Sequence, residues 1–200
     1  MININKRDRL IESACVLFHR NGLPSTSLAD IAKHADIPIG NVYYYFKTKE
    51  ELALAVLDTH REKYAAAFSL LNEKLYDPRA RLIEAVRTYD KKREDFARYG
   101  CPIGKIVDDA DVAKDNIAKA AAQIFSEFVD WASGQFMQLG HGNDSRRLAV
   151  SLISGIQGGI LLAKSLQEPK IISDETARLV DWLETIPNKK IQLGKISVRA

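Results

Sequence analysis

The sequence has little of several residue types that mark particular classes of protein. It contains two cysteines, Cys15 and Cys101, in 200 residues, which is too few for a disulfide scaffold. Neither CxxC nor HExxH spacing occurs, and the four histidines are scattered along the chain: His19, His34, His60 and His141. We therefore expect no metal site and no bound cofactor.

The sequence also shows no sign of a targeting segment. The first ten residues, MININKRDRL, lack the apolar region of a signal peptide. No stretch reads as long and apolar enough to span a bilayer. The sequence thus predicts a cytoplasmic protein without a membrane partner, whose thiols a reducing compartment would keep free.

The charge balance is only mildly basic. The formal net charge is +3 and the sequence pI is about 8.8, too weak an excess to indicate a nucleic-acid partner by itself. The excess nevertheless lies at the N-terminal end, where the first 49 residues carry seven Lys or Arg against four acids. A DNA-contacting region would need its positive charge gathered in this way.

Apolar residues recur with the helical period throughout, and no strand-rich region or repeat is visible. The pattern predicts an all-α fold with three short helices, a long linking helix and about five longer ones. The short set forms a proposed DNA-binding domain over 1–47 and the longer set a helical bundle over 48–187, followed by a basic tail over 188–200. In the bundle we expect one helix to run to about Tyr99 and the last to begin at Ser173.

Three sets of residues mark helix ends in the N-terminal part. Gly22 is suited to end the first helix. Ser27 with Asp30, and Thr48 with Glu51, have the spacing of capping boxes at the starts of two later helices.

The segment NVYYYF, 41–46, is too aromatic for a purely buried helix. Neighbouring helical residues are rotated by about 100°, so three consecutive tyrosines cannot all face one core. Two short helices separated by a tight turn fit a helix-turn-helix, whose second helix enters the major groove. A tyrosine ring ending in a hydroxyl suits such a surface, and Lys47 and Lys49 flank the start of the next helix, whose positive end also favours a phosphate.

The stretch RLIESACVLFHRNGLPSTSLADIAKHADIPIGNVYYYFKTKEELALAVL resembles the DNA-binding domain of TetR-type transcriptional regulators. The resemblance covers roughly a quarter of the chain. It implies a homodimer that binds a palindromic double-stranded DNA operator and, as the family default, a repressor released by an inducer. Positions matching the family's DNA contacts are Thr26, Ser27, Ile39, Gly40, Asn41, Tyr43, Tyr44, Tyr45 and Lys49.

One position departs from the family pattern, and two others match its core. Ile39 stands where a polar residue is often found, so base reading there is limited to apolar contact, for instance with a thymine methyl group. Phe18 and Phe46 match core positions, and Phe46 is expected to anchor the short helix to its domain.

Cys101 lies in the break YGCPIG, just before an expected helix starting near Pro102. A thiol near a helix N-terminus has its thiolate stabilised and its pKa lowered; the alternative is a buried structural cysteine. The strings around Cys101 and Lys164 resemble regulators of N-ethylmaleimide-reductase genes. That resemblance implies that Cys101 senses electrophiles or hypochlorous-type oxidants and that Lys164 reacts with it, whereas Cys15 is expected to be inert core.

The C-terminal helices supply candidates for a ligand cavity and a dimer interface. Aromatic residues that could line a cavity, or simply fill the core, are Tyr89, Phe96, Phe125, Phe128 and Trp131. Small residues in LAVSLISGIQGGILLA, 148–163, allow close helix approach, either within the chain or between subunits. The family resemblance favours a dimer through helices near 145–167 and 173–186.

Two other classes of protein are weighed against this reading. An all-α enzyme with Cys101 as nucleophile would need a base, and no histidine stands in a catalytic signature. A helical interaction module that does not bind DNA would leave the exposed tyrosines and flanking lysines without a role. The sequence therefore predicts a regulator that responds to a small molecule or a reactive electrophile.

Overall fold

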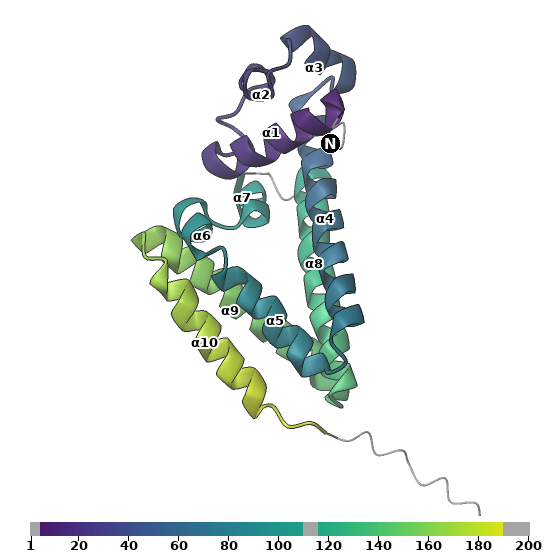
Figure 1. Cartoon of the computed structure of the whole chain (residues 1–200), viewed down its shortest axis with the longest axis vertical. Helices are drawn as coiled ribbons and strands as arrows, with labels where there is room; N and C mark the ends of the chain where they lie inside the picture. The colour runs from purple at the N-terminus through teal and green to yellow at the C-terminus, as the bar shows by residue number, and fades with distance from the viewer. Residues whose placement is uncertain (1–4, 110–115, 190–200) are drawn as a thin grey trace, which may run out of the picture.

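The computed structural model describes residues 5–109 and 116–189, and its regular structure within those ranges is entirely helical (Figure 1). This agrees with the predicted all-α fold. The elements are α1 (Lys6–Asn21), α2 (Leu28–His34), α3 (Ile39–Tyr45), α4 (Lys49–Lys74), α5 (Pro78–Asp90), α6 (Arg93–Tyr99), α7 (Pro102–Asp109), α8 (Asn116–Gln138), the 3-10 helix η1 (Gly142–Asp144), α9 (Ser145–Leu166) and α10 (Lys170–Thr185). The predicted tail lies outside the described residues beyond 189.

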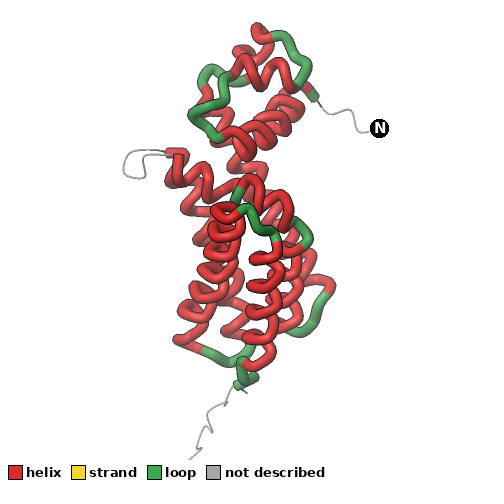
Figure 2. Tube along the Cα trace, turned by 90° about the vertical axis from the view of Figure 1, so that its left-hand side faces the viewer, coloured by secondary structure: helices red, strands yellow, loops and turns green. Residues whose placement is uncertain are grey.

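Helices α1 to α3 form a small unit at one end of an elongated molecule (Figures 1 and 2). Helix α1 contributes the fully buried side chains Leu10, Ala14 and Phe18 to its core. The first turns of α4 belong to the same core through residues such as Leu52 and Val56. The DNA-binding unit and the start of the linking helix are therefore packed as one body, because apolar burial is shared between them.

Capping bonds fix the helix ends in this unit largely as the sequence predicts. Gly22 has φ +89° and ends α1, its N–H donating to the Phe18 carbonyl oxygen at 3.0 Å. The Ser27–Asp30 capping box is complete. At α4 the Thr48 hydroxyl accepts from the Glu51 N–H at 3.1 Å. The Glu51 carboxylate, however, accepts from the N–H of Lys47 rather than of Thr48, so the predicted second capping box is not closed as expected.

The larger unit is built from long helices packed in pairs. Helices α4 and α8 run side by side, while α9 packs against α8, α6 and α10, and α10 also packs against α5 (Figure 1). Buried residues of α5, α6, α9, α10 and the later part of α8 form a second core, whereas those of α7 and the first part of α8 belong to the N-terminal core. Cys101 and Ile153 contact both cores. The region around Cys101 is therefore where the two cores meet.

Two helix boundaries differ from the sequence prediction. The helix expected to continue to Tyr99 ends at Asp90, and a turn over 91–92 separates it from α6. No proline or glycine marks this break; packing of α6 against α9 accompanies it. The last helix begins at Lys170, three residues before Ser173, whose hydroxyl instead donates to the Asp90 carboxylate at 2.5 Å.

Helix α9 corrects the expectation that no segment could span a bilayer. Residues 142–166 are long and apolar enough by length and composition. Part of this apolar character serves packing within the chain, since buried residues such as Leu152, Ile156 and Ile160 join the second core. A core helix of a soluble protein passes the same test of length and hydropathy.

Candidate DNA interface and ligand cavity

The tyrosines of α3 divide by direction. Val42 is fully buried and Phe46, which ends the helix, is nearly so. On the other side Tyr43 and Tyr44 are 50% and 76% exposed. Tyr45 is half-buried and packs against the core, with its ring edge-on to that of Tyr44 at 5.0 Å between centroids. The rotation between neighbouring helical residues thus leaves two phenols on an open surface.

The start of α3 is open to close approach. Ile39 and Gly40 are exposed and Asn41 is half-buried. A Cβ added at Gly40 would have no neighbour within 4 Å. The protein therefore has room for a larger side chain at this position. A surface without side-chain bulk lets a backbone approach a groove closely.

The two predicted phosphate-contacting residues before α2 behave differently. Thr26 is 1% exposed and its hydroxyl donates to the Gly22 carbonyl oxygen at 2.8 Å. The structure therefore corrects its assignment: this side chain lies in the core, completing the turn after α1. Ser27 is exposed, and its hydroxyl donates to the Asp30 carboxylate at 2.6 Å.

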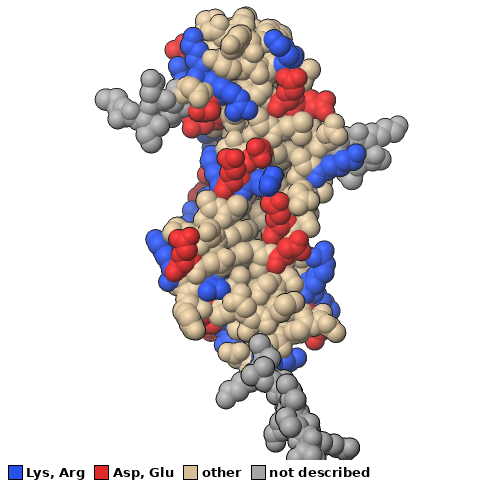
Figure 3. Space-filling view, turned by 90° about the vertical axis from the view of Figure 1, so that its right-hand side faces the viewer, with Lys and Arg blue, Asp and Glu red and all other residues tan. Residues whose placement is uncertain are grey.

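Both lysines near the start of α4 contact backbone carbonyl oxygens. Lys49 Nζ donates to Leu23 at 2.8 Å, and Lys47 Nζ donates to Tyr43 at 2.6 Å. The first of these charges thus lies at the turn between α1 and α2, and the second lies at α3. Figure 3 shows Lys and Arg on either side of a largely uncharged tip of the N-terminal unit.

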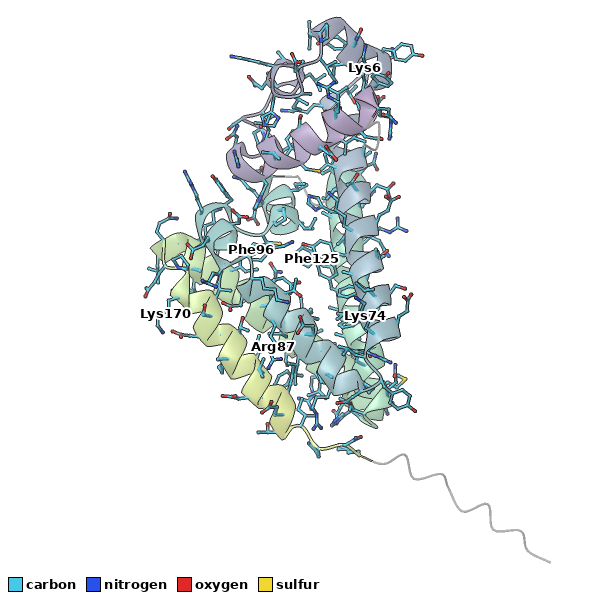
Figure 4. The ribbon with its side chains drawn as sticks, viewed as in Figure 1. Lys6, Lys74, Arg87, Phe96, Phe125 and Lys170 are labelled. Atoms are coloured by element: carbon cyan, nitrogen blue, oxygen red, sulfur yellow. The ribbon has the colours of Figure 1, made fainter. Side chains whose placement is uncertain are left out.

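An apolar cavity lies inside the larger unit, between α4, α5, α6, α8 and α9. It has a volume of about 70 Å³, well below the roughly 300–1,000 Å³ of typical ligand pockets. Four of the five predicted aromatic residues line it: Tyr89, Phe96, Phe128 and Trp131. Phe125 does not; it packs edge-on against Phe128 at 5.8 Å in the neighbouring core (Figure 4).

Sequence reasoning missed the contribution of α4 to this cavity. Tyr64 and Phe68 line it, and the Phe68 ring stacks on Trp131 at 4.3 Å with an interplanar angle of 10°. Their spacing of four residues on an alanine-rich helix could have indicated a shared apolar face. Burial raises the pKa of Tyr64 and of Tyr89, so both hydroxyls stay protonated at neutral pH.

Cys101 and Lys164 line one depression of about 220 Å³, together with Lys105 and Gln157. The structure thus brings the predicted sensor pair to one place. The Gly104 N–H donates to the Cys101 sulfur at 3.4 Å. Burial nevertheless raises the pKa of the Cys101 thiol, outweighing the backbone donors that lower it. The lowered pKa expected from the helix terminus is therefore wrong, because desolvation is the larger effect. Burial likewise raises the pKa of Cys15, and this side chain packs against the N-terminal core.

Helix α7 joins this depression to the DNA-binding unit. The His19 ring Nε2 donates to the Gly100 carbonyl oxygen at 2.8 Å. Lys105 Nζ donates to the carbonyl oxygens of His19 and Arg20, and the Asp109 carboxylate accepts from the Leu23 N–H at 2.9 Å. The end of α1 and the turn after it are thus bonded to α7 and to Gly100, which lies just before α7.

The sequence is similar to known regulators along most of its length. Residues 10–56 match the family model for bacterial regulatory proteins of the tetR family. Residues 80–175 match the model for the C-terminal domain of LmrA/YxaF-like transcriptional regulators. An HTH-type transcriptional regulator of Mycobacterium tuberculosis is 32% identical over 171 residues, covering 79% of this chain and 84% of that protein.

Solved structures show the same fold. A TetR regulator from Legionella pneumophila superposes with a TM-score of 0.79 at 25% identity, covering 91% of this chain and 99% of that one. The reduced form of Escherichia coli NemR superposes with a TM-score of 0.70 at 20% identity, covering 88% and 96%, which shows a shared fold alone.

These matches span both units, with the helix-turn-helix and the helical domain in the expected order. Regulators of this kind are soluble proteins that bind operator DNA, act as homodimers and respond to small-molecule ligands; they are not enzymes. The predicted class is therefore confirmed and the enzyme alternative is set aside. This chain belongs to the TetR family of transcriptional regulators.

Proposed function

We propose that this protein is a cytoplasmic repressor that binds a palindromic operator as a homodimer through α3 and leaves it when a small molecule enters the cavity. The observation that carries the proposal is the division of α3. Val42 and Phe46 fix it to the core, and Tyr43 and Tyr44 stand exposed beside Gly40. A seven-residue helix presenting rigid aromatic rings with hydroxyl groups suits a major groove and its phosphates.

A gel-shift assay on the DNA flanking the protein's own gene tests this function. We expect specific binding that weakens steeply with salt, because phosphate contacts release counterions. Two recognition helices of a dimer should meet half-sites roughly 34–36 Å apart or a multiple of this. Absence of specific binding at low salt would overturn the proposal.

Variants locate the interface. Tyr43→Ala should reduce operator affinity by about 10- to 100-fold, the effect of losing a good groove contact. Lys49→Ala should weaken binding to all DNA sequences and lessen the salt dependence. Tyr76→Ala is the matched control, since Tyr76 is 99% exposed in the turn between α4 and α5. If Tyr43→Ala binds like the control, α3 is not the reading helix.

Ligand binding in the cavity would release this repressor from its operator. Its free volume is too small for a drug-sized molecule, so a ligand must separate the surrounding helices. One wall is α4, whose first turns belong to the DNA-binding core. A ligand that moves α4 would therefore also move α3. The operator would then bind the ligand-free state more tightly than the ligand-bound state.

A second candidate signal is covalent, and it rests on the shared depression of Cys101 and Lys164. With N-ethylmaleimide, the sulfur would bond to one alkene carbon and the other would take up a proton. Hypochlorous acid would convert the thiol to a sulfenic acid with release of chloride, and condensation with the Lys164 amine would release water. Cys101→Ser separates the candidates: if it still leaves DNA on treatment as the wild type does, Cys101 is not the sensor. The raised pKa of the thiol favours the non-covalent ligand as the principal signal.

A further inference from the structure

We propose that the cavity selects an uncharged aromatic ligand that carries hydrogen-bond acceptors, and that it rejects lipophilic cations. This inference rests on the proposed function of the cavity as the inducer site. It adds the chemical class of the inducer and the residues that choose it, and it follows from three features of the lining.

The first feature is a set of hydrogen-bond donors without partners. Trp131 Nε1 is buried and has no hydrogen-bond partner within the described part of the chain. Tyr64 and Tyr89 line the same cavity, and no hydrogen bond joins either hydroxyl to a described residue. Unlike the indole N–H, these two hydroxyls are not among the fully buried unpaired groups of the described residues. Buried polar groups in proteins are nearly always paired, so the unpaired indole N–H of Trp131 indicates a ligand that supplies an acceptor, and the two tyrosine hydroxyls are available to bond the same ligand.

The second feature is the protonation of these donors. Burial raises the pKa of both tyrosine hydroxyls far above neutrality. They therefore remain neutral O–H groups in the physiological range, and indole N–H is a donor only. A carbonyl, ether or aromatic nitrogen on the ligand would accept from all three groups, whereas a ligand that offers only donors would leave the indole N–H unpaired.

The third feature is the absence of negative charge. None of the described residues lining the cavity is Asp or Glu, and the charged residue among them is Lys92. A cation entering an apolar cavity needs a compensating charge, since burial without one is strongly unfavourable. Aromatic faces alone compensate only in part, and Lys92 adds repulsion.

The shape of the lining favours a flat molecule. Phe68 and Trp131 stack with nearly parallel rings at 4.3 Å, and Tyr89 stacks on Phe96 at 5.8 Å with an interplanar angle of 27°. Figure 4 shows Phe96 on the α6 side of the interior, facing the α4–α8 pair. A planar ring can slide against such faces with little change of side-chain rotamer.

Three bicyclic probes of similar size test the selection by isothermal titration calorimetry: 1-tetralone, tetralin and the N-methylquinolinium cation. We expect 1-tetralone to bind about tenfold more tightly than tetralin, the effect of one net hydrogen bond, and the cation not to bind measurably. Equal binding of tetralin and 1-tetralone, preferred binding of the cation, or binding of none of the three would each overturn the proposal.

Variants that keep each ring but remove its donor assign the preference to residues. Tyr64→Phe, Tyr89→Phe and Trp131→Phe should together abolish the preference for 1-tetralone, and at least one single variant should reduce it. Tyr76→Phe, outside the cavity, is the control. In Trp182→Phe, Trp131 is the one remaining tryptophan, so its fluorescence should change with 1-tetralone. An unchanged preference in the triple variant, or unchanged fluorescence, would overturn the assignment. Circular dichroism shows whether each variant is folded. If the triple variant does not fold, the single variants test the three donors one at a time.

Operator binding by the same preparation separates the two proposals. If the protein binds its operator and 1-tetralone does not bind the protein, only the ligand class fails. If 1-tetralone binds with the expected preference but no specific DNA binding is found, the cavity assignment stands and the proposed repressor function fails.

Discussion

His19 at the end of α1 and Gly100 just before α7 are joined by a hydrogen bond of 2.8 Å from the ring Nε2 to the carbonyl oxygen. Gly100 follows α6, which carries the cavity residue Phe96. A ligand that displaces the Phe96 ring would therefore act on the segment that holds α1. This is a second physical connection between cavity and DNA-binding unit, parallel to α4, and it suggests variants that change signalling more than binding.

Lys105→Met should weaken the response to ligand while leaving operator binding largely intact. Lys105 Nζ bonds the carbonyl oxygens of His19 and Arg20 at 3.3 and 3.2 Å, and both of these acceptors belong to α1 rather than α3. Loss of these bonds should cost about 1 kcal/mol of stability and loosen the link from α7 to α1. The ratio of operator Kd with and without 1-tetralone, measured by gel shift, should move toward one. Lys119→Met on α8 is the control; an equal ratio in both variants would contradict a role for α7 in the link.

Gly40→Ala should stabilise the protein and weaken DNA binding. Space for the methyl group is open in the protein, and alanine is favoured over glycine in a helix by up to about 1 kcal/mol. The same methyl group would stand on the surface proposed to enter the groove. We expect a higher thermal midpoint and a lower operator affinity in the same variant. A variant that is more stable and binds DNA unchanged would place Gly40 outside the interface.

Local rules predict part of this molecule, and packing decides the rest. The 100° rotation between neighbours was enough to separate Tyr43 and Tyr44 from the buried side of α3, because the helix is short and anchored at Phe46. Phe125 and Phe128 lie three residues apart on one face of α8. Periodicity could not show that Phe128 lines the cavity and Phe125 does not, because the other walls come from α4, α5, α6 and α9.

Competing effects explain two further differences. A helix terminus lowers the pKa of a nearby thiol, but whether burial at Cys101 outweighs it depends on contacts distant in sequence. Thr26 stands at a family DNA-contact position, yet its hydroxyl completes a turn in the core. No proline or glycine lies between α5 and α6, so the sequence contains no local signal for the break between them.

Gly100→Ala should be strongly unfavourable. Gly100 has φ +83°, a conformation that costs other residues roughly 1–2 kcal/mol. An added Cβ would also come within 2.9 Å of Lys164 Cδ. We expect urea unfolding to show a loss of about 1–2 kcal/mol or more. Gly134→Ala on α8, where a Cβ meets nothing within 4 Å, is the matched control and should be neutral or stabilising; comparable losses in the two would contradict the strain.

Leu162→Glu should dissociate the homodimer. Leu162 is 54% exposed on the outer stripe of α9 that also carries Leu161 and Leu166. This stripe fits the predicted interface, whereas Gly155 and Gly159 face Glu175 of α10 within the chain. A buried glutamate at a subunit interface would be unpaired and costly. Size-exclusion chromatography with light scattering should show a monomer, while Leu70→Glu on α4 stays dimeric. A dimeric Leu162→Glu would place the interface elsewhere.

Stability should fall as the pH is lowered from about 6.5 to about 4, and His60 should cause part of the loss. Burial, followed by nearby Lys63, lowers the pKa of His60 to about 4 from 6.5. Between those values the unfolded chain binds a proton that the folded chain does not, so the free energy of unfolding decreases with falling pH. Burial also lowers the pKa of His19, which acts in the same direction. Allowing for partial exposure of the ring, we expect His60 to contribute about 1–2 kcal/mol between pH 7 and 5. Urea unfolding of the wild type and of His60→Gln across this range measures the difference: the variant should show a shallower slope, and parallel curves would mean that His60 titrates alike in both states.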